Sequence, residues 1–387
     1  MIDRKVLSLL LTLMCLSVSG SILFVAKASP SVIRVPQDYS TIQAAIDHAN
    51  PGDTVSVSAG TYYENLHIDK NLTLTGENRE TTILNGTGGS FGIEANSTSV
   101  SITGFKIVNA TVGIFLENSA ESTVSGNEVT GSHANITSQE EGIWLYSSNN
   151  SVVSDNIVHD AGTCGVVLCG HSSEDTVTLN TVEDCGGGLE VSGEGCFIFH
   201  NNFVNNQNQT EILDSFHNDW NDTYEGNYWS DYNGTDANQD GIGDTPYLID
   251  VNNQDNHPLM GIFSQFEITK QGQTYTLTTI CNSTITNFGY TGAINFNITA
   301  PEGTGGFCRI VIPNTLYDQN YPILIDGSPP LEENELSLSN GTHTYLYFTY
   351  SNSAHSITIV PEFATAFFLL IVMLTIPTAI VVRKRAC

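Results

Sequence analysis

The chain has few basic residues, and its central part has none. Of the 387 residues, 12 are Lys or Arg and 41 are Asp or Glu, so the formal net charge is −29. No Lys or Arg occurs between Lys106 and Lys270. Lyases and epimerases that act on uronates need a basic side chain to neutralise the substrate carboxylate and to serve as the base, so this gap argues against such chemistry there. The same charge excludes nucleic acid as a partner.

The sequence also lacks a Cys-x-x-Cys pair and any Met-rich or His-rich run, which are patterns that support metal transfer. Cysteines outside the two hydrophobic ends are even in number. In an exported chain this favours disulfides, whereas buried free thiols are the alternative explanation. The pairing stays open for these residues: Cys164, Cys169, Cys185, Cys196, Cys281 and Cys308.

Both ends of the chain are hydrophobic. Residues 1–28 combine Arg4 and Lys5, an apolar run and the small-residue pattern Ala26-Lys27-Ala28, which predicts a cleaved signal peptide, with an uncleaved anchor as the alternative. Residues 363–382 are uncharged and long enough to cross a bilayer, and the basic tail 383–387 follows them. We therefore expect a single-pass membrane protein whose bulk lies at the cell surface, with the membrane as one partner.

Glycosylation is a further expectation for an exported chain, because Asn-x-Ser/Thr sequons recur along the sequence. They lie at Asn71, Asn85, Asn96, Asn109, Asn135, Asn149, Asn208, Asn221, Asn233, Asn282, Asn297 and Asn340.

The central chain repeats itself. Apolar segments that begin with glycine start at Gly113, Gly142, Gly165 and Gly188, which are 29, 23 and 23 residues apart. Each is followed by a polar turn and by a second short strand that contains Asn. Because no helical period accompanies this repeat, it predicts an all-β fold, a solenoid in which each coil buries its core only against its neighbours. The Asn residues suit tight turns and a hydrogen-bonded ladder, and residues 132–141 are expected to be an inserted loop.

The two ends of the solenoid need caps. Residues 39–49 predict a short helix with Ser40 or Thr41 at its N-terminus and an apolar face, which would cover the first coil. Beyond Met260 the coil pattern stops, and alternating strands between Gly and Pro turns over residues 263–360 predict a small β-sandwich that serves as a spacer.

Several motifs give the chain a family resemblance. Thr41-Ile42-Gln43-Ala44-Ala45-Ile46, Pro51-Gly52-Asp53-Thr54-Val55 and Gly226-Asn227-Tyr228-Trp229 are similar to segments that open and close NosD-like and pectin-lyase-like proteins. The resemblance covers residues 33–260 and implies a right-handed parallel β-helix. Pro361-Glu362-Phe363 resembles the sorting signals of archaeal surface proteins.

A calcium loop is the sharpest local motif. Oxygen ligands fall at Asp236, Asn238, Asp240 and Asp244, the carbonyl of Ile242 is at the seventh position, and Gly241 takes the glycine position. Position twelve is Tyr247 instead of Glu, so other carboxylates such as Asp250 or Asp255 would have to complete the site. We expect structural calcium here, with a plain Asp-Gly turn as the alternative.

The NosD-like resemblance also implies copper as an alternative cofactor. Soft ligands would come from the four cysteines of the coils together with His171 and His200. A polysaccharide hydrolase is a second alternative, because it needs only two carboxylates. The candidates for such a pair are Asp155, Asp160, Asp175, Glu183, Asp184 and Glu190.

Carbohydrate binding has its own candidates, Trp144 and Tyr146, which share a strand next to the expected loop. Trp144 in the core is the alternative. Taken together, the sequence favours a non-enzymatic cell-surface β-helix that contacts cations, glycans or other components of the cell envelope.

Overall fold

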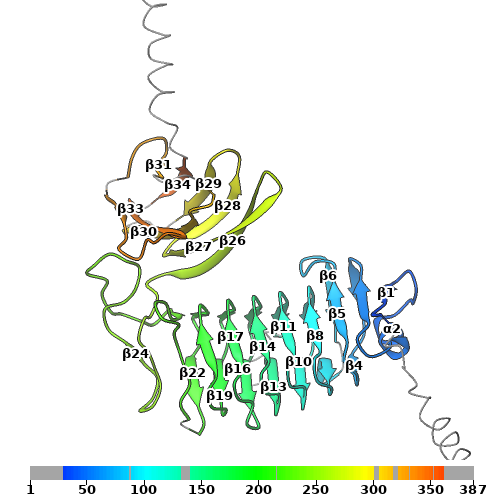
Figure 1. The fold of residues 1–387 in the computed structure, drawn as a ribbon. Helices are drawn as coiled ribbons and strands as arrows, with labels where there is room; N and C mark the ends of the chain where they lie inside the picture. Colours follow the sequence, from blue (N-terminus) through cyan, green and yellow to red (C-terminus); the bar gives the residue numbers. More distant parts are fainter. Residues whose placement is uncertain are drawn as a thin grey trace, which may run out of the picture. The chain divides into compact units, whose positions relative to one another are not determined.

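A computed structural model describes residues 29–86, 89–131, 140–214, 216–299, 305–316, 321–330, 332–351 and 353–360. The described residues from Val32 onward form one compact unit. Within it, the chain winds into a parallel β-solenoid of the right-handed type with about eight turns (Figure 1). The predicted β-helix is therefore confirmed.

Three parallel sheets of eight, eight and seven strands form the walls of the solenoid, and each complete coil contributes one strand to each sheet. Sheet A contains β1 (Val32–Val35), β2 (Thr54–Val57), β5 (Thr73–Gly76), β8 (Ser101–Thr103), β11 (Thr123–Ser125), β14 (Val152–Ser154), β17 (Thr176–Thr178) and β20 (Phe197–Phe199). Sheet B contains β3 (Gly60–Tyr62), β6 (Thr82–Asn85), β9 (Lys106–Val108), β12 (Glu128–Thr130), β15 (Ile157–His159), β18 (Thr181–Glu183), β21 (Asn202–Val204) and β23 (Tyr228–Trp229). Sheet C contains β4 (Leu66–Ile68), β7 (Phe91–Ala95), β10 (Val112–Glu117), β13 (Glu141–Tyr146), β16 (Cys164–Cys169), β19 (Gly187–Val191) and β22 (Asn208–Ile212).

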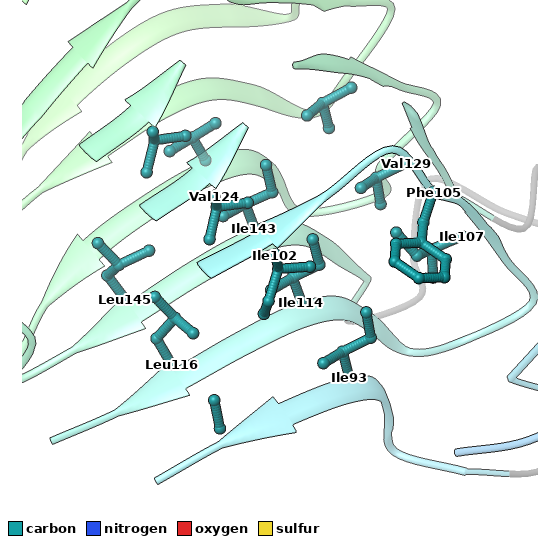
Figure 2. Close-up of a cluster of buried hydrophobic side chains, with 14 of the residues drawn as sticks. Ile93, Ile102, Phe105, Ile107, Ile114, Leu116, Val124, Val129, Ile143 and Leu145 are labelled. Carbon is teal, nitrogen blue, oxygen red and sulfur yellow. The ribbon is translucent and has the colours of Figure 1, made fainter. Parts of the chain in front are cut away.

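The core runs along the interior of the solenoid. Figure 2 shows Ile102 and Val124 from sheet A, Ile107 and Val129 from sheet B, and Ile114 from sheet C pointing into the same space. Strand register stacks equivalent apolar residues on each other, so Ile93, Ile114 and Ile143 form one row. Because every coil supplies similar side chains, the core is continuous from one coil to the next.

A ladder of buried asparagines runs beside this core at the start of the sheet B strands. Asn127 donates from N and Nδ2 to Asn156 Oδ1 at 3.0 and 3.1 Å, and Asn156 donates in the same way to Asn180 Oδ1 at 3.0 Å. Asn201 and Asn227 continue the ladder. The predicted hydrogen-bonded ladder is confirmed, whereas the prediction that these asparagines occupy the tight left-handed turns is wrong.

The left-handed turn positions lie one residue earlier than the ladder. Gly126, Asp155, Leu179 and His200 have positive φ values of 65, 54, 63 and 58°. The asparagines therefore use their side chains to satisfy buried backbone groups, and the residue before each of them makes the turn.

Both ends of the solenoid are capped. The helix α2 (Ile42–His48) has Thr41 as its N-cap and buries Ile42, Ala45 and Ile46, as predicted. Glu64 accepts hydrogen bonds from the backbone N–H groups of Ile42 and Gln43. At the other end, Asp255 in the short pair β24 (Tyr247–Leu248) and β25 (Gln254–Asp255) accepts from Asn227 N at 2.7 Å and Trp229 Nε1 at 2.9 Å.

Two antiparallel sheets follow and share a second core, consistent with the predicted sandwich. One contains β26 (Ile262–Lys270), β27 (Gln273–Cys281), β30 (Gly306–Pro313), β33 (His343–Tyr350) and β32 (Glu332–Glu335). The other contains β28 (Thr284–Tyr290), β29 (Ile294–Thr299), β34 (Ala354–Ile359) and β31 (Ile323–Ile325). Cys281 and Cys308 face each other across β27 and β30.

The expected localisation needs correction. Among the described residues, no helix is long and apolar enough to cross a bilayer. This finding contradicts the prediction of a single-pass membrane protein, which we withdraw. The segment predicted to span, residues 363–382, lies outside the described residues, as do the basic tail and the predicted signal peptide of residues 1–28.

The asparagine ladder predicts a large effect of Asn156→Ala on stability. This change leaves Asn127 N and Nδ2 without their acceptor and removes the donor to Val124 O, all in a buried place. We expect the free energy of unfolding, measured by urea titration, to fall by about 3 to 5 kcal/mol. In the matched control, Asn71→Ala at an exposed position, we expect less than about 0.5 kcal/mol. Equal losses in the two variants would contradict the role of the ladder.

Asp175 predicts a pH dependence of stability. Its side chain is buried, Oδ1 accepts from Ser151 N at 2.7 Å, and burial raises its pKa to about 7. Because the folded state holds this proton more tightly than the unfolded chain, the contribution of Asp175 to the free energy of unfolding should be highest below pH 4. It should fall by up to about 4 kcal/mol as the pH rises to 7. Asp175→Asn keeps the acceptor and should reduce the difference between urea titrations at pH 4 and pH 7. An unchanged difference would refute this assignment.

Candidate functional site

The outer face of sheet C carries aromatic and acidic side chains in aligned rows. Along β13, Ile143 and Leu145 point into the core, so Trp144 between them points outward. Register then places Glu94, Phe115, Trp144, Val167, Glu190 and Glu211 in one row across β7, β10, β13, β16, β19 and β22. This row brings together residues that are far apart in the sequence.

Aromatic rings occupy one half of the face. Phe91 stacks on Phe115 with the ring centroids 4.6 Å apart, Phe115 lies 4.8 Å from Trp144, and Trp144 meets Tyr146 edge to face at 6.5 Å. The Tyr146 side chain is 41% exposed. The structure thus places Trp144 on the outer face, half-buried, and not in the core. Together with Tyr146 it offers a ring surface to a ligand.

Carboxylates lie on the same face, on β13 and on the later strands β19 and β22. Glu190 and Glu211 are register partners on neighbouring strands, so two like charges lie side by side. Burial and then the charge of Glu211 raise the pKa of Glu190, and burial and then the charge of Glu190 raise the pKa of Glu141. Within the described part of the chain, Oε2 of Glu141 is buried without a hydrogen-bond partner. Glu141 is on β13, the strand of Trp144, and lies in a different row from Glu190 and Glu211. We call these three residues the carboxylate ladder. The sequence did not predict it, because it depends on register.

The cysteines of the coils do not form one cluster. Cys185 and Cys196 belong to the core, where burial raises the pKa of each thiol to about 12. Cys164 and Cys169 lie on β16, and Trp144 Nε1 donates a hydrogen bond to Cys169 Sγ at 2.8 Å. Burial raises the pKa of both Cys164 and Cys169. All six cysteines outside the two hydrophobic ends are free in the structure, so the expected disulfides are not formed there.

The histidines that the sequence grouped with these cysteines lie apart from them. His171 is exposed at a turn, and His200 Nε2 lies 2.9 Å from Glu225 Oε2. Within the residues that the structure describes, no three His, Cys, Asp or Glu side chains converge where a metal ion could bind. Two thiols five residues apart on one strand are also too distant to share an ion. The described donor set therefore does not fit a copper site.

The predicted calcium loop is closed by its own hydrogen bonds. Asp236 accepts from the N–H groups of Asp240 and Gly241 at 3.0 and 2.9 Å, and Asp240 accepts from Ile242 N at 2.9 Å. Asp244 Oδ2 accepts from Ala237 N at 2.9 Å. Asn238 donates to Asp240 Oδ2 at 2.9 Å, and the Ile242 side chain is buried. These contacts account for the loop without an ion, and calcium stays a prediction.

The carboxylates proposed for a hydrolase are divided among different faces. Asp155 lies at a turn beside Arg79, Asp175 is buried, and Glu190 is on sheet C. On sheet B, His159 Nδ1 lies 2.6 Å from Asp160 Oδ2 and its Nε2 lies 3.3 Å from Glu128 Oε1. Glu128 also pairs with Lys106. This charged network was missed because it again depends on register between coils.

Comparisons with known proteins agree with the solenoid. Residues 37–234 match the family described as "Periplasmic copper-binding protein (NosD)". A "Probable ABC transporter binding protein NosD" of Stutzerimonas stutzeri is 28% identical over 143 residues, which are 35% of this chain and 28% of that protein. The protein with the same description in Pseudomonas aeruginosa is 24% identical over 159 residues, 39% of this chain and 32% of that protein. The chain thus spans about a third or less of the length of these relatives.

Among solved structures, an alginate lyase from Paenibacillus sp. is 15% identical, with a TM-score of 0.40, over 51% of this chain and 76% of that chain. The Dettilon tailspike protein is 11% identical, with a TM-score of 0.28, over 85% of this chain and 93% of that chain. These scores carry no argument about function. The family match, in contrast, covers half of the chain, and on this ground the chain belongs to the NosD family.

Proposed function

We propose that the chain is a non-enzymatic, exported β-helix that presents an acidic face to cations or to glycans of the cell envelope. The carboxylate ladder on the outer face of sheet C carries this proposal. Export is supported by the predicted signal peptide and by the periplasmic description of the family.

Carboxylates on the outer face of sheet C repel each other. Glu190 has Glu211 beside it on the next strand, and no Lys or Arg occurs in any strand of sheet C. Like charges in this arrangement destabilise a sheet, and burial adds to the cost of ionisation. A cation that bridges two of the carboxylates would relieve the repulsion. The half-buried ring of Trp144 and the exposed ring of Tyr146 would accept the apolar face of a sugar next to them.

Copper binding is the second candidate, because the family carries that description. Cys169 is the thiol that suits it best, since it lies half-buried on the outer face beside Trp144. Two observations oppose it: burial raises the pKa of this thiol, which disfavours the thiolate, and the described soft ligands do not converge. We therefore rank it below the acidic scaffold.

Calcium titration of the full chain tests the leading proposal. We expect thermal unfolding to shift upward by a few degrees in millimolar calcium, because the ion binds only the folded face. Glu190→Gln should lose at least half of this shift and should itself be stabilised by up to about 1 kcal/mol at pH 7 without calcium. A remaining shift would come from the loop around Asp236. The control Glu80→Gln, at an exposed loop position, should respond like the parent chain. The proposal fails if all three proteins respond alike.

Metal analysis after loading with copper(I) separates the two candidates. The scaffold proposal predicts less than one equivalent of tightly held copper, with no dependence on Cys169. One full equivalent that disappears in Cys169→Ser would instead establish the copper function. The same preparations, incubated with neutral and acidic polysaccharides, should release no reducing sugar.

A further inference from the structure

A cavity of about 430 Å³ lies where the last coils meet the antiparallel sheets. Its lining includes Thr178, His200, Asp222, Tyr224, Glu225 and Tyr345. A volume of this size is in the range of small-molecule sites, and mixed aromatic and polar walls are typical of them. Its lining contains neither the carboxylate ladder nor the aromatic rings of sheet C.

Glu225 of the lining belongs to a charge-compensated pair with Arg309, which lies behind it. Arg309 is fully buried, pairs with Glu225 and donates from Nη1 to Asp240 O at 3.1 Å. Burial opposes ionisation of Glu225, but hydrogen bonding to His200 and the charge of Arg309 outweigh it, so its pKa is lowered. The carboxylate therefore stays ionised and is neutralised from behind by the guanidinium.

The same groups are rigidly positioned. The His200 ring lies flat on Phe263 with the centroids 4.1 Å apart and an angle of 6°. Asn202 exchanges two hydrogen bonds with the backbone of Phe263, at 2.8 and 2.9 Å, which fixes β26 against β21. The cavity is thus formed before any ligand arrives, so binding would require little ordering of the walls.

Two polar side chains of the lining can form further hydrogen bonds. Thr178 Oγ1 is buried and has no hydrogen-bond partner in the described part of the chain. Asp222 Oδ1 accepts from the N–H groups of Tyr224 and Glu225 at 2.7 and 2.8 Å, whereas its Oδ2 lies 3.9 Å from His200 Nε2. Buried polar atoms such as Thr178 Oγ1 normally have partners, and the Asp222 side chain is 40% exposed, so both positions favour a ligand with hydroxyl groups. At the rim, Tyr224 is 57% exposed and offers a ring face.

From this geometry we propose that the cavity binds a neutral saccharide of one or two sugar residues. Hydroxyl groups of the sugar would pair with Thr178 Oγ1 and Asp222 Oδ2, and its apolar face would stack on Tyr224. An anionic sugar would be repelled by the carboxylates of Asp222 and Glu225. An apolar ligand would leave the polar atoms unpaired. This inference does not depend on the carboxylate ladder or on copper.

The test is a titration of the full chain, followed by calorimetry and by saturation-transfer NMR. The panel contains glucose, galactose, mannose, N-acetylglucosamine and their disaccharides, with glucuronate and choline as charged comparisons. At least one neutral sugar should bind, and Tyr224→Ala and Thr178→Val should each weaken it about five- to tenfold. The matched control Tyr63→Ala removes a ring that is 75% exposed on the second coil and should bind as the parent chain does.

Three outcomes would overturn the inference. The first is the absence of any neutral sugar binding at about 10 mM. The second is equal affinity in the parent chain and in Tyr224→Ala, with circular dichroism showing that the variant is folded. The third is binding of choline or glucuronate in preference to every neutral sugar of the panel. Failure here would leave the calcium and copper experiments unaffected, since they concern sheet C.

Discussion

Stacking of one coil on the next is the interaction on which the rest of the structure depends. A single coil has strands of three to six residues and cannot bury its apolar side chains or satisfy its backbone by itself. The asparagine ladder shows how completely the coils rely on each other. Each member pairs with the asparagine of the following coil through its N–H and its amide group, and Asp255 ends the series.

The positions of the surface groups follow from this stacking. Because register is fixed from coil to coil, outward side chains of successive coils lie about 4.8 Å apart in straight rows. Glu190 with Glu211, and Phe115 with Trp144, are neighbours in such a row, and the contact between Glu128 and His159 on sheet B joins neighbouring strands diagonally. Their chemistry is therefore a property of the solenoid and not of any local motif. The cavity near His200 differs, because it forms where the solenoid ends and the antiparallel sheets begin.

Prediction from the sequence succeeded where the signal was local or periodic. The glycine-led repeats indicated the coils, Thr41 and the apolar face after it indicated α2, and the asparagines indicated the ladder. Prediction failed where residues of two different coils must be aligned. The number of residues from one coil to the next varies, so the sequence alone does not fix which residues become neighbours. Cys164 and Cys185 show this, since one lies on a strand of sheet C and the other is a core residue before the next strand. The membrane-spanning prediction rested on an uncharged stretch and the basic tail after it, and the described residues contain no helix long and apolar enough to cross a bilayer.

Native-state hydrogen exchange tests most directly whether the central coils form one cooperative stack. The backbone N–H groups of Asn127, Asn156, Asn180 and Asn201 each donate to the next asparagine of the ladder. If stacking holds the structure together as described, these four amides should exchange only through global unfolding, with equal protection that matches the free energy of unfolding. Protection that falls stepwise from one coil to the next would contradict the account.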